Sequence, residues 1–212
     1  MTDNFNRFRE FMQLPEQEGG DAYYVIELVR RGKDCPDLPA ANYHFKNYYI
    51  DTLAKYDKVQ DEIRLLCRTL RLRAYVSVCR KSFRRVTMNT LAEMARRAAL
   101  DDFKRPDRIF ASCSGEYVDK DDRHWVVDVD DCQFFADDSG TQPRWMRVRE
   151  IINECAPEGD KIEMVIPTQT GVHLITRLFH YGEFHWKWQI ELGEENVPEI
   201  KKNHLTLLFE NL

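Results

Sequence analysis

Apolar positions change their spacing several times along this chain, and each spacing predicts one type of secondary structure. Apolar side chains three or four residues apart predict helices at 58–70, 87–100 and 146–155. Asp21 is a plausible N-cap for a further helix at 21–31. Alternating or continuous apolar runs predict strands at 73–79, 124–130, 162–167, 172–179, 184–192 and 205–209, with 110–118 weakly strand-like.

The helix expected at 87–100 should pack on the core through one side. Thr87 or Asn89 could cap it. Its apolar residues recur with helical spacing, and this pattern is typical of a helix face turned inward. The residues expected on that inner face are Leu91, Met94, Ala95 and Ala98.

The order of these elements predicts the fold class. From residue 73 onward strands and helices intermingle, which favours an α+β fold with a mixed β-sheet and helices packed on it. Residues 1–72 are expected to form a helical N-terminal section, and residues 73–212 the α+β core. A chain of 212 residues is short enough for both parts to form one compact unit.

Charge is unevenly distributed, although the net charge is only −5. Residues 64–108 contain 13 Lys and Arg against 4 acidic residues, whereas residues 114–160 contain 13 acidic residues against 5 basic ones. Such a pair of segments suits a protein that holds a polyanion and gathers cations at a reaction centre. Two surfaces that are merely solvated, or that pair with each other, explain the same charges.

The sequence predicts a cytoplasmic protein without a membrane partner. It contains no apolar run of the roughly 18–20 residues needed to cross a bilayer. Its first residues show no apolar stretch behind a basic start, so we expect no signal peptide. The cysteines form no C-x-x-C pair, which favours small core residues over a zinc site or a disulfide framework; they are Cys35, Cys67, Cys79, Cys113, Cys132 and Cys155.

Two aspartates at the end of one predicted strand form the first candidate site. Within His124-Trp-Val-Val-Asp-Val-Asp-Asp131, Asp128 and Asp130 are two residues apart. Because side chains alternate between the faces of a strand, both carboxylates point the same way. Neighbouring carboxylates repel each other unless a cation lies between them, and such oxygen ligands suit Mg²⁺ or Mn²⁺. The pair predicts a metal site acting on phosphates, with polar termination of a strand as the structural alternative.

A histidine enters a second predicted strand directly after a polar turn. Thr168-Gln-Thr-Gly171 precedes Val172 and His173. Hydroxyl groups and backbone N–H donors in a turn of this kind, here with Thr170 and Gly171, can cradle a phosphate. A histidine beside them can bond a phosphate oxygen or orient an attacking group, although a lone histidine on a strand is more often structural.

Together these two motifs resemble a known family. Val126-Val-Asp-Val-Asp130, followed after the helix expected at 146–155 by Gly171-Val-His173, is similar to the motif order of the archaeo-eukaryotic primase superfamily, the primase–polymerases. The resemblance covers roughly residues 73–192, and Asp130 and His173 are separated by 43 residues (173 minus 130). It implies an RRM-like core and a nucleotidyltransferase that uses Mg²⁺ or Mn²⁺. Asp128 and Asp130 would be metal ligands, and His173 would contact the incoming nucleotide.

The same resemblance implies partners and a setting. Its substrates would be a nucleoside triphosphate and DNA or RNA, and a replicative helicase or another replication protein would be a partner. The sequence also resembles small proteins encoded by bacteriophages, which would place it in the host cytoplasm.

The family's third motif is an apolar residue followed by an acid on a later strand. No aspartate occurs after Asp160, and the best match is Ile190-Glu191, on the polar side of the strand expected at 184–192. Glu191 is therefore expected to be the third metal ligand. An exposed strand glutamate is the alternative, and it would leave the site with two carboxylates.

Basic side chains supply the candidates for phosphate binding. Arg80, Arg84 and Arg85 flank Lys81-Ser-Phe83 directly after the strand expected at 73–79. Their guanidinium forks suit phosphate oxygens, and a solvated loop is the alternative. Arg177 shares a strand face with His173, so it could neutralise a triphosphate or pair with Asp128 or Asp131.

Two other functions compete with a polymerase. A catalytically inactive nucleic-acid-binding or adaptor protein could be built on the same fold. His204-Leu-Thr206 also matches half of a two-histidine phosphoesterase, which needs two His-x-Thr motifs. The only possible second motif, His173-Leu-Ile-Thr176, has one residue too many, which turns its threonine to the opposite face.

Overall fold

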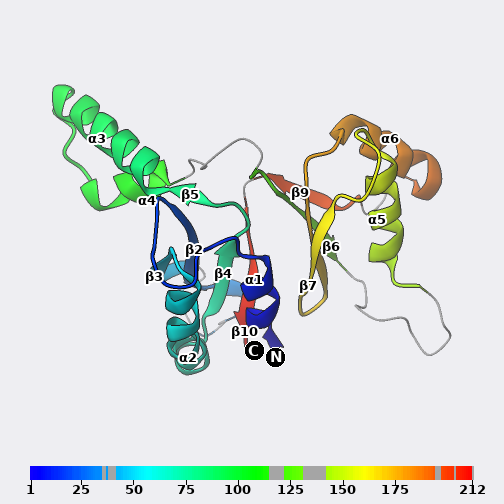
Figure 1. Cartoon of the computed structure of the whole chain (residues 1–212), viewed down its shortest axis with the longest axis horizontal. Helices are drawn as coiled ribbons and strands as arrows, with labels where there is room; N and C mark the ends of the chain where they lie inside the picture. The colour runs from blue at the N-terminus through cyan, green and yellow to red at the C-terminus, as the bar shows by residue number, and fades with distance from the viewer. Residues whose placement is uncertain are drawn as a thin grey trace.

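Two antiparallel β-sheets lie side by side in this protein (Figure 1). The structure is a computed structural model that describes residues 1–34, 37, 42–114, 122–130, 142–193, 197–202 and 204–211. The large sheet has the strand order β1-β10-β4-β2-β3, with β5 also paired to β2, and the small sheet has the order β7-β8-β6-β9. This arrangement confirms the α+β class but replaces the expected mixed sheet with two antiparallel ones.

The large sheet joins the two ends of the chain. Its strands are β1 (Thr2–Asp3), β2 (Ala22–Arg30), β3 (Tyr43–Ile50), β4 (Arg73–Ser77), β5 (Lys81–Ser82) and β10 (Leu205–Glu210). The first and last strands pair, so both termini lie together below the sheet in Figure 1. One face is covered by α1 (Phe5–Phe11) and α2 (Leu53–Leu70).

Residues 21–31 were predicted to be helical, and this prediction was wrong, because Ala22–Arg30 form β2. Aromatic and β-branched residues favour strands, and this segment is rich in both. Hydrogen bonds to β3, β4 and β5 settle the choice, with side chains buried on both faces of the strand. Asp21 does cap a helix, but a distant one: its carboxylate accepts hydrogen bonds from the Ser82 hydroxyl at 2.5 Å and from the Arg84 backbone N–H at 2.6 Å.

The expected helical section at 1–72 is likewise not found. Residues 1–72 contribute three strands, β1, β2 and β3, to the large sheet. Strand β4 begins at Arg73 and lies between β10 and β2 in that sheet. A boundary between residues 72 and 73 would therefore cut through one hydrogen-bonded sheet rather than separate two units.

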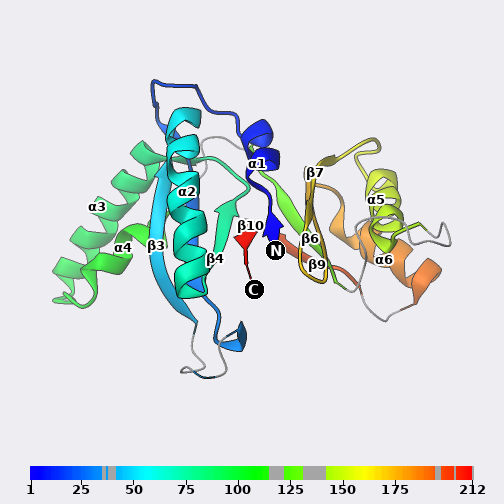
Figure 2. The same ribbon diagram turned by 90° about the horizontal axis from the view of Figure 1, so that it is seen from below.

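The small sheet carries its own helical layer. It consists of β6 (Trp125–Asp130), β7 (Ile162–Pro167), β8 (Gly171–Thr176) and β9 (Glu199–Lys202). On its outer face lie α5 (Arg144–Glu154) and α6 (Tyr181–Leu192) (Figures 1 and 2). On the inner face, Val126, Ile166 and Ile175 join the core of the large sheet, so the two sheets share one hydrophobic core.

Residues 184–192 form most of α6, not the strand that their alternating pattern predicted. Phe184 and Trp188 are buried one helical turn apart, whereas Trp186 and Ile190 are 60% and 65% exposed. Local signals support the helix: the His180 ring accepts a hydrogen bond from the Glu183 N–H at 3.0 Å. The alternating pattern was therefore misleading, because Trp186 and Ile190 are exposed, whereas Phe184 and Trp188 are buried at helical spacing.

Helix α3 (Phe83–Ala99) corrects another expectation. Only Val86 of this helix is buried, next to α4 (Ile109–Cys113) and the β2 side chains Tyr23 and Val25. Beyond this first turn α3 projects from the body (Figures 1 and 2). The residues predicted to face inward are therefore exposed: Leu91, Met94, Ala95 and Ala98.

Short 3₁₀ turns occur at Gly32–Asp34 and Pro106–Arg108. Within the weakly strand-like 110–118, the structure describes residues 110–114, of which 110–113 are helical. Cys67, Cys79 and Cys155 are buried, while Cys35 and Cys132 lie outside the described residues. None of the helices described is long and apolar enough to cross a membrane.

Candidate functional site

A cavity of about 320 Å³ lies between the two sheets and brings the main sequence candidates together. The small sheet and its β7–β8 turn contribute Asp128, Asp130, Thr168, Gln169, Thr170, His173, Glu199 and Lys201. The large sheet and the residue after β2 contribute Arg31, Arg73, Tyr75 and Leu207. Three cationic side chains and three carboxylates thus line one cavity.

Strand register places the acidic pair beside the histidine. On β6, Asp128 and Asp130 alternate with the buried Val127 and Val129, so both carboxylates turn away from the outer helices. Strand β8 runs antiparallel to β6 and places His173 opposite Asp128. The sequence motifs therefore meet as neighbours on adjacent strands.

His173 is fixed by contacts on both ring nitrogens. Its Nε2 lies 3.3 Å from Asp128 Oδ1, and its Nδ1 lies 2.7 Å from the buried hydroxyl oxygen of Thr206 on β10. A proton on Nε2 faces the carboxylate favourably, and the direction of the hydrogen bond between Nδ1 and the Thr206 hydroxyl depends on the protonation of the ring. Thr206 thus orients the ring, and its role was missed at the sequence level, where it was considered only with His204.

The glycine of the second motif is required by close packing. A side-chain carbon at Gly171 would lie 2.1 Å from the carbonyl oxygen of Val129, on the neighbouring strand. The turn before it is closed by two hydrogen bonds, from Thr168 N–H to the Gly171 carbonyl at 2.9 Å and from Gly171 N–H to the Thr168 hydroxyl at 3.1 Å. Thr170 is exposed at the cavity rim.

Strand β9 supplies two cavity residues that the sequence reasoning missed. Glu199 lies directly opposite Asp128 in the β6–β9 register. The Lys201 ammonium lies 2.7 Å from Asp128 Oδ2 and 3.1 Å from Glu199 Oε2. The only sequence signal was the spacing of Glu199 and Lys201 within Glu-Ile-Lys-Lys, which puts both on one strand face.

These contacts determine the charge state of the cavity. Burial alone would raise the pKa of Asp128, but hydrogen bonds and charges from His173 and Lys201 outweigh it and hold that pKa well below its ordinary value. Burial would lower the pKa of Lys201, but Asp128 and Glu199 raise it. At neutral pH the carboxylate and the ammonium are therefore both charged.

The opposite wall is basic and belongs to the large sheet. Arg73 is held on both sides, by Asp34 at 2.7 Å and by Glu210 at 3.0 Å. Arg31 reaches the Tyr75 hydroxyl at 3.5 Å. The cavity therefore has an acidic wall from the small sheet and a wall carrying two guanidinium groups from the large sheet.

Glu191, the expected third metal ligand, lies elsewhere. It is on α6, on the outer side of the small sheet, and its carboxylate pairs with Arg147 of α5. The prediction failed because residues 184–192 are helical, which removed the strand face on which Glu191 was placed. Glu199 occupies the position next to Asp128 that Glu191 was expected to fill.

The arginine candidates also lie outside the cavity lining. Arg177 follows β8, is 70% exposed and pairs with Glu163. The guanidinium of Arg80 pairs with Asp122 at 3.1 Å, before the start of β6 and thus far from the Asp130 end. Arg84 and Arg85 are exposed in the first turn of α3. Asp131, considered as a partner for Arg177, lies outside the described residues.

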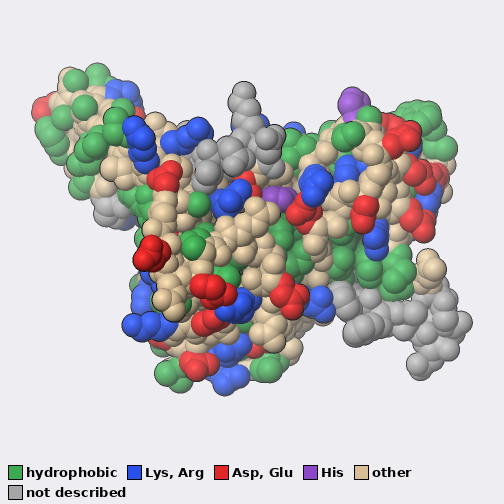
Figure 3. Space-filling model, viewed as in Figure 1, with side chains coloured by type: hydrophobic (Ala, Val, Ile, Leu, Met, Phe, Trp, Pro, Cys, Tyr) green, Lys and Arg blue, Asp and Glu red, His purple; other side chains and the backbone are tan. Residues whose placement is uncertain are grey.

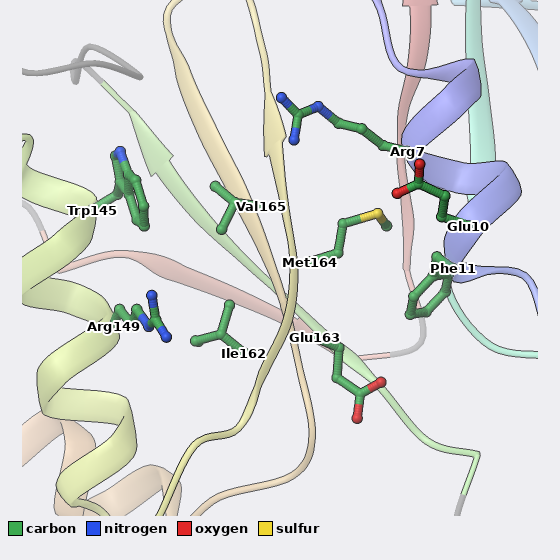
Figure 4. Close-up of a pocket in the computed structure, with 9 residues that line it drawn as sticks. All are labelled: Arg7, Glu10, Phe11, Trp145, Arg149, Ile162, Glu163, Met164 and Val165. Carbon is green, nitrogen blue, oxygen red and sulfur yellow. The ribbon is translucent and has the colours of Figure 1, made fainter.

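A second cavity, of about 470 Å³, lies between α1, β7 and α5 (Figure 4). Its apolar lining includes Phe11, Met164 and Val165. Two of its charged side chains already have partners: Glu163 pairs with Arg177, and Arg149 lies 3.4 Å from Asp160. This cavity shares no lining residue with the first, and the aspartate and histidine motifs lie only in the first.

The donor set of the first cavity can be compared with the needs of a metal ion. Three carboxylates suit a hard divalent cation such as Mg²⁺. Among the described residues, no three His, Cys, Asp or Glu side chains are yet gathered as ligands. In the structure, the Lys201 ammonium contacts both Asp128 and Glu199. The donor chemistry therefore fits a metal ion if the flexible lysine side chain moves.

Searches against family models, curated proteins and solved structures gave no match for this chain. The cavity geometry thus carries the functional argument.

Proposed function

We propose that this protein is a metal-dependent nucleotidyltransferase of the primase–polymerase type, acting on nucleoside triphosphates and nucleic acid. One observation carries the proposal: Asp128, Asp130 and His173 line one cavity together with a third carboxylate, Glu199. Their positions on adjacent strands follow the motif order that resembles the archaeo-eukaryotic primase superfamily. An RRM-like core is part of this proposal.

The acidic wall would hold the metal. Asp128, Asp130 and Glu199 are the carboxylates that would bind Mg²⁺ or Mn²⁺, and the metal would neutralise charge on the phosphate oxygens. Lys201 would then move from the two carboxylates to the nucleotide phosphates. Its present position offsets part of the negative charge of this wall before a substrate binds.

The remaining cavity residues would position the triphosphate. His173, oriented by Thr206, presents an Nε2–H donor that can pass from Asp128 to a phosphate oxygen. Arg31 offers a guanidinium from the facing sheet, and Thr170 with the 168–171 turn lies at the rim. Arg73, already held by two carboxylates, would keep this wall rigid rather than bind substrate.

The test begins with calorimetric titration of Mn²⁺, with and without a nucleoside triphosphate. We expect nucleotide-dependent Mn²⁺ binding in the wild type and its loss in Asp128→Asn and Asp130→Asn, which keep side-chain volume. Glu191→Gln is the matched control and should bind as the wild type does. Template-directed incorporation of labelled nucleotide should likewise occur with the wild type and Glu191→Gln and be lost in Asp128→Asn and Asp130→Asn. Absence of Mn²⁺ binding in the wild type would contradict the metal site.

One observation favours a second function, a catalytically inactive nucleic-acid-binding or adaptor protein. An ammonium between Asp128 and Glu199 satisfies both carboxylates without any metal. In that case the wild type would bind single-stranded nucleic acid but show neither Mn²⁺ binding nor incorporation. The phosphoesterase alternative is not proposed, because His204 is exposed and does not line the cavity.

A further inference from the structure

Strand β7 forms one edge of the small sheet, and part of that edge is open. Among the strands that the structure describes, β7 pairs with β8 alone. The Pro167 carbonyl turns away from β8, because it accepts a hydrogen bond from the Asn4 side-chain amide at 3.2 Å. Backbone groups alternate in direction along an antiparallel strand, so the N–H and C=O of Val165, two residues earlier, also face the open edge.

Two helices stand beside this edge and turn it into a groove. The second cavity, of about 470 Å³, is lined by β7, α1 and α5. Met164 turns toward the α1 side, where Phe11 lies, and Val165 turns toward the α5 side, where Trp145 lies (Figure 4). Figure 3 shows hydrophobic side chains at the surface where α1 and the small sheet meet, with acidic and basic side chains beside them. The open backbone of Val165 thus has a side-chain wall on each face of the sheet.

The charged side chains of the groove leave one carboxylate without a partner. Arg7, Arg149 and Glu163 each already have an interaction partner. Glu10, exposed on α1, has no hydrogen bond or ion pair with any residue that the structure describes. A cation on a bound molecule would therefore complement the charge of this groove.

We propose that the groove binds an extended peptide of a partner protein, which adds to β7 as a fifth strand of the small sheet. The peptide backbone would form two hydrogen bonds with the N–H and C=O of Val165, as peptides do when they join an open sheet edge. Because side chains alternate, the residue opposite Val165 would face Trp145. Its two neighbours would face the α1 side, an apolar one against Met164 and a basic one beside Glu10.

A separate peptide fits this groove better than a second copy of the chain or a nucleic acid does. In a second copy, β7 is itself flanked by α1 and α5. Those helices would have to pass the same helices of the first copy before the two edges could pair. A nucleic acid has no peptide backbone to match the edge, and its phosphates would meet the unpaired carboxylate of Glu10.

The open stretch of edge is short, and this limits the expected affinity. At one end Pro167 has no N–H, and its carbonyl is already bonded to Asn4. At the other end the Lys161 carbonyl accepts a hydrogen bond from the Arg177 N–H at 2.9 Å. The peptide therefore pairs over only a few residues, and we expect dissociation constants in the micromolar range.

The first test is selection of displayed random linear peptides on the full chain. Selected sequences should share two adjacent apolar residues next to a Lys or Arg. Synthetic versions should bind the wild type in solution, as measured by fluorescence polarisation. A library that yields no peptide binding above background would overturn the proposal.

A proline at position 165 tests the backbone contact. Because the Val165 N–H faces the open edge, Val165→Pro removes no hydrogen bond to β8 and should keep the fold, as checked by circular dichroism and urea unfolding. Selected peptides should bind this variant about tenfold more weakly, because it lacks the edge donor. Val165→Ile keeps the donor and is the matched control. Equal binding to the wild type and Val165→Pro would place the peptides elsewhere and contradict the proposal.

Methylation of single backbone nitrogens in a selected peptide gives a readout that does not depend on how a variant folds. Only every second N–H of an added strand faces its neighbour. Binding should therefore be lost at alternate peptide positions. Equal loss at every position, or no loss at any, would rule out addition to the sheet.

The charge of Glu10 tests the orientation of the bound peptide. Glu10→Gln should weaken basic peptides about threefold, as expected for an exposed ion pair. The same peptides with Gln in place of Lys or Arg should bind Glu10→Gln and the wild type equally. Glu18→Gln, exposed and outside the groove lining, is the control. An unchanged affinity of basic peptides for Glu10→Gln would contradict the position given to the basic residue.

Sedimentation velocity without peptide distinguishes a partner peptide from a second copy. The wild type should keep the 25.2 kDa mass of one chain across the micromolar range. A dimer that is lost in Val165→Pro would assign the edge to a second copy and overturn the proposal.

Discussion

Two buried or half-buried lysines in or next to the small sheet have opposite kinds of partner, neutral carbonyls for one and carboxylates for the other. Lys161, just before β7, donates to four backbone carbonyls, those of Asn153, Cys155, Pro157 and Gly159, at 2.6–3.1 Å. Lys201, on β9, instead lies between the carboxylates of Asp128 and Glu199. Burial lowers the pKa of Lys161, whereas the two carboxylates raise the pKa of Lys201.

This difference separates a structural cation from an exchangeable one. The carbonyls around Lys161 belong to one loop, and another cation could not satisfy all of them while also anchoring β7. The carboxylates around Lys201 can accept another cation, because their own positions are fixed by β6 and β9. The same charge therefore fixes a loop in one region and offsets part of the negative charge of a candidate reaction site in the other.

The largest expected effect is on stability, at Lys161. Lys161→Met should lower the free energy of unfolding by about 2–3 kcal/mol, because it leaves four carbonyls without their charged donor. Urea unfolding in the absence of metal measures this. Lys58→Met, at an exposed position of α2, is the control and should change stability by less than about 0.5 kcal/mol. Equal changes in unfolding free energy for Lys161→Met and Lys58→Met would show that the four hydrogen bonds of Lys161 do not stabilise the fold.

The next effect is on binding, at Lys201. Lys201→Met should raise Mn²⁺ affinity about tenfold, close to 1.4 kcal/mol, because the metal no longer competes with an ammonium. The same variant should bind a nucleoside triphosphate more weakly than the wild type does. Lys202→Met, on the adjacent position of β9, should leave both affinities unchanged. An unchanged Mn²⁺ affinity in Lys201→Met would show that Lys201, like Lys161, is a structural cation and does not compete with a metal.

Acid titration sharpens the comparison on the side of Asp128. Because its pKa is lowered by folding, the carboxylate stabilises the protein above its unfolded value of about 4, and this contribution disappears as pH falls through the folded value. With a chelator present, the free energy of unfolding of the wild type should exceed that of Asp128→Asn by an amount on the order of 1 kcal/mol near neutral pH. That gap should shrink below about pH 4. A gap that is independent of pH would contradict the assigned cause.

The smallest effect is expected at Arg177. Its partner Glu163 lies outside the first cavity, and the arginine is 70% exposed. Arg177→Gln should change unfolding free energy by less than about 1 kcal/mol, as is usual for surface ion pairs. Nucleotide affinity should match the wild type. A clear loss of nucleotide binding would restore Arg177 as a phosphate ligand.

Local pattern predicted several helices and strands of the fold. The strands at β6 and β7 and the helices at α2 and α5 match the predicted segments to within a few residues. The apolar stripes of α2 and α5 each face a core, and β6 is a short apolar run buried on both faces, so local pattern identified them. At β2 and α6 the sequence is compatible with both helix and strand. Pairing with neighbouring strands decided β2, and burial of Phe184 and Trp188 one helical turn apart decided α6.

The sequence alone determined that Asp128 and Asp130 share a strand face and that His173 follows a tight turn containing Gly171. These are properties of nearby residues, and alternation fixes them. Only the tertiary structure decided which distant residues complete the cavity, namely Glu199, Lys201, Thr206 and the wall at Arg31 and Arg73. Strand order and register bring these groups together, and both depend on packing between sheets that no local pattern records.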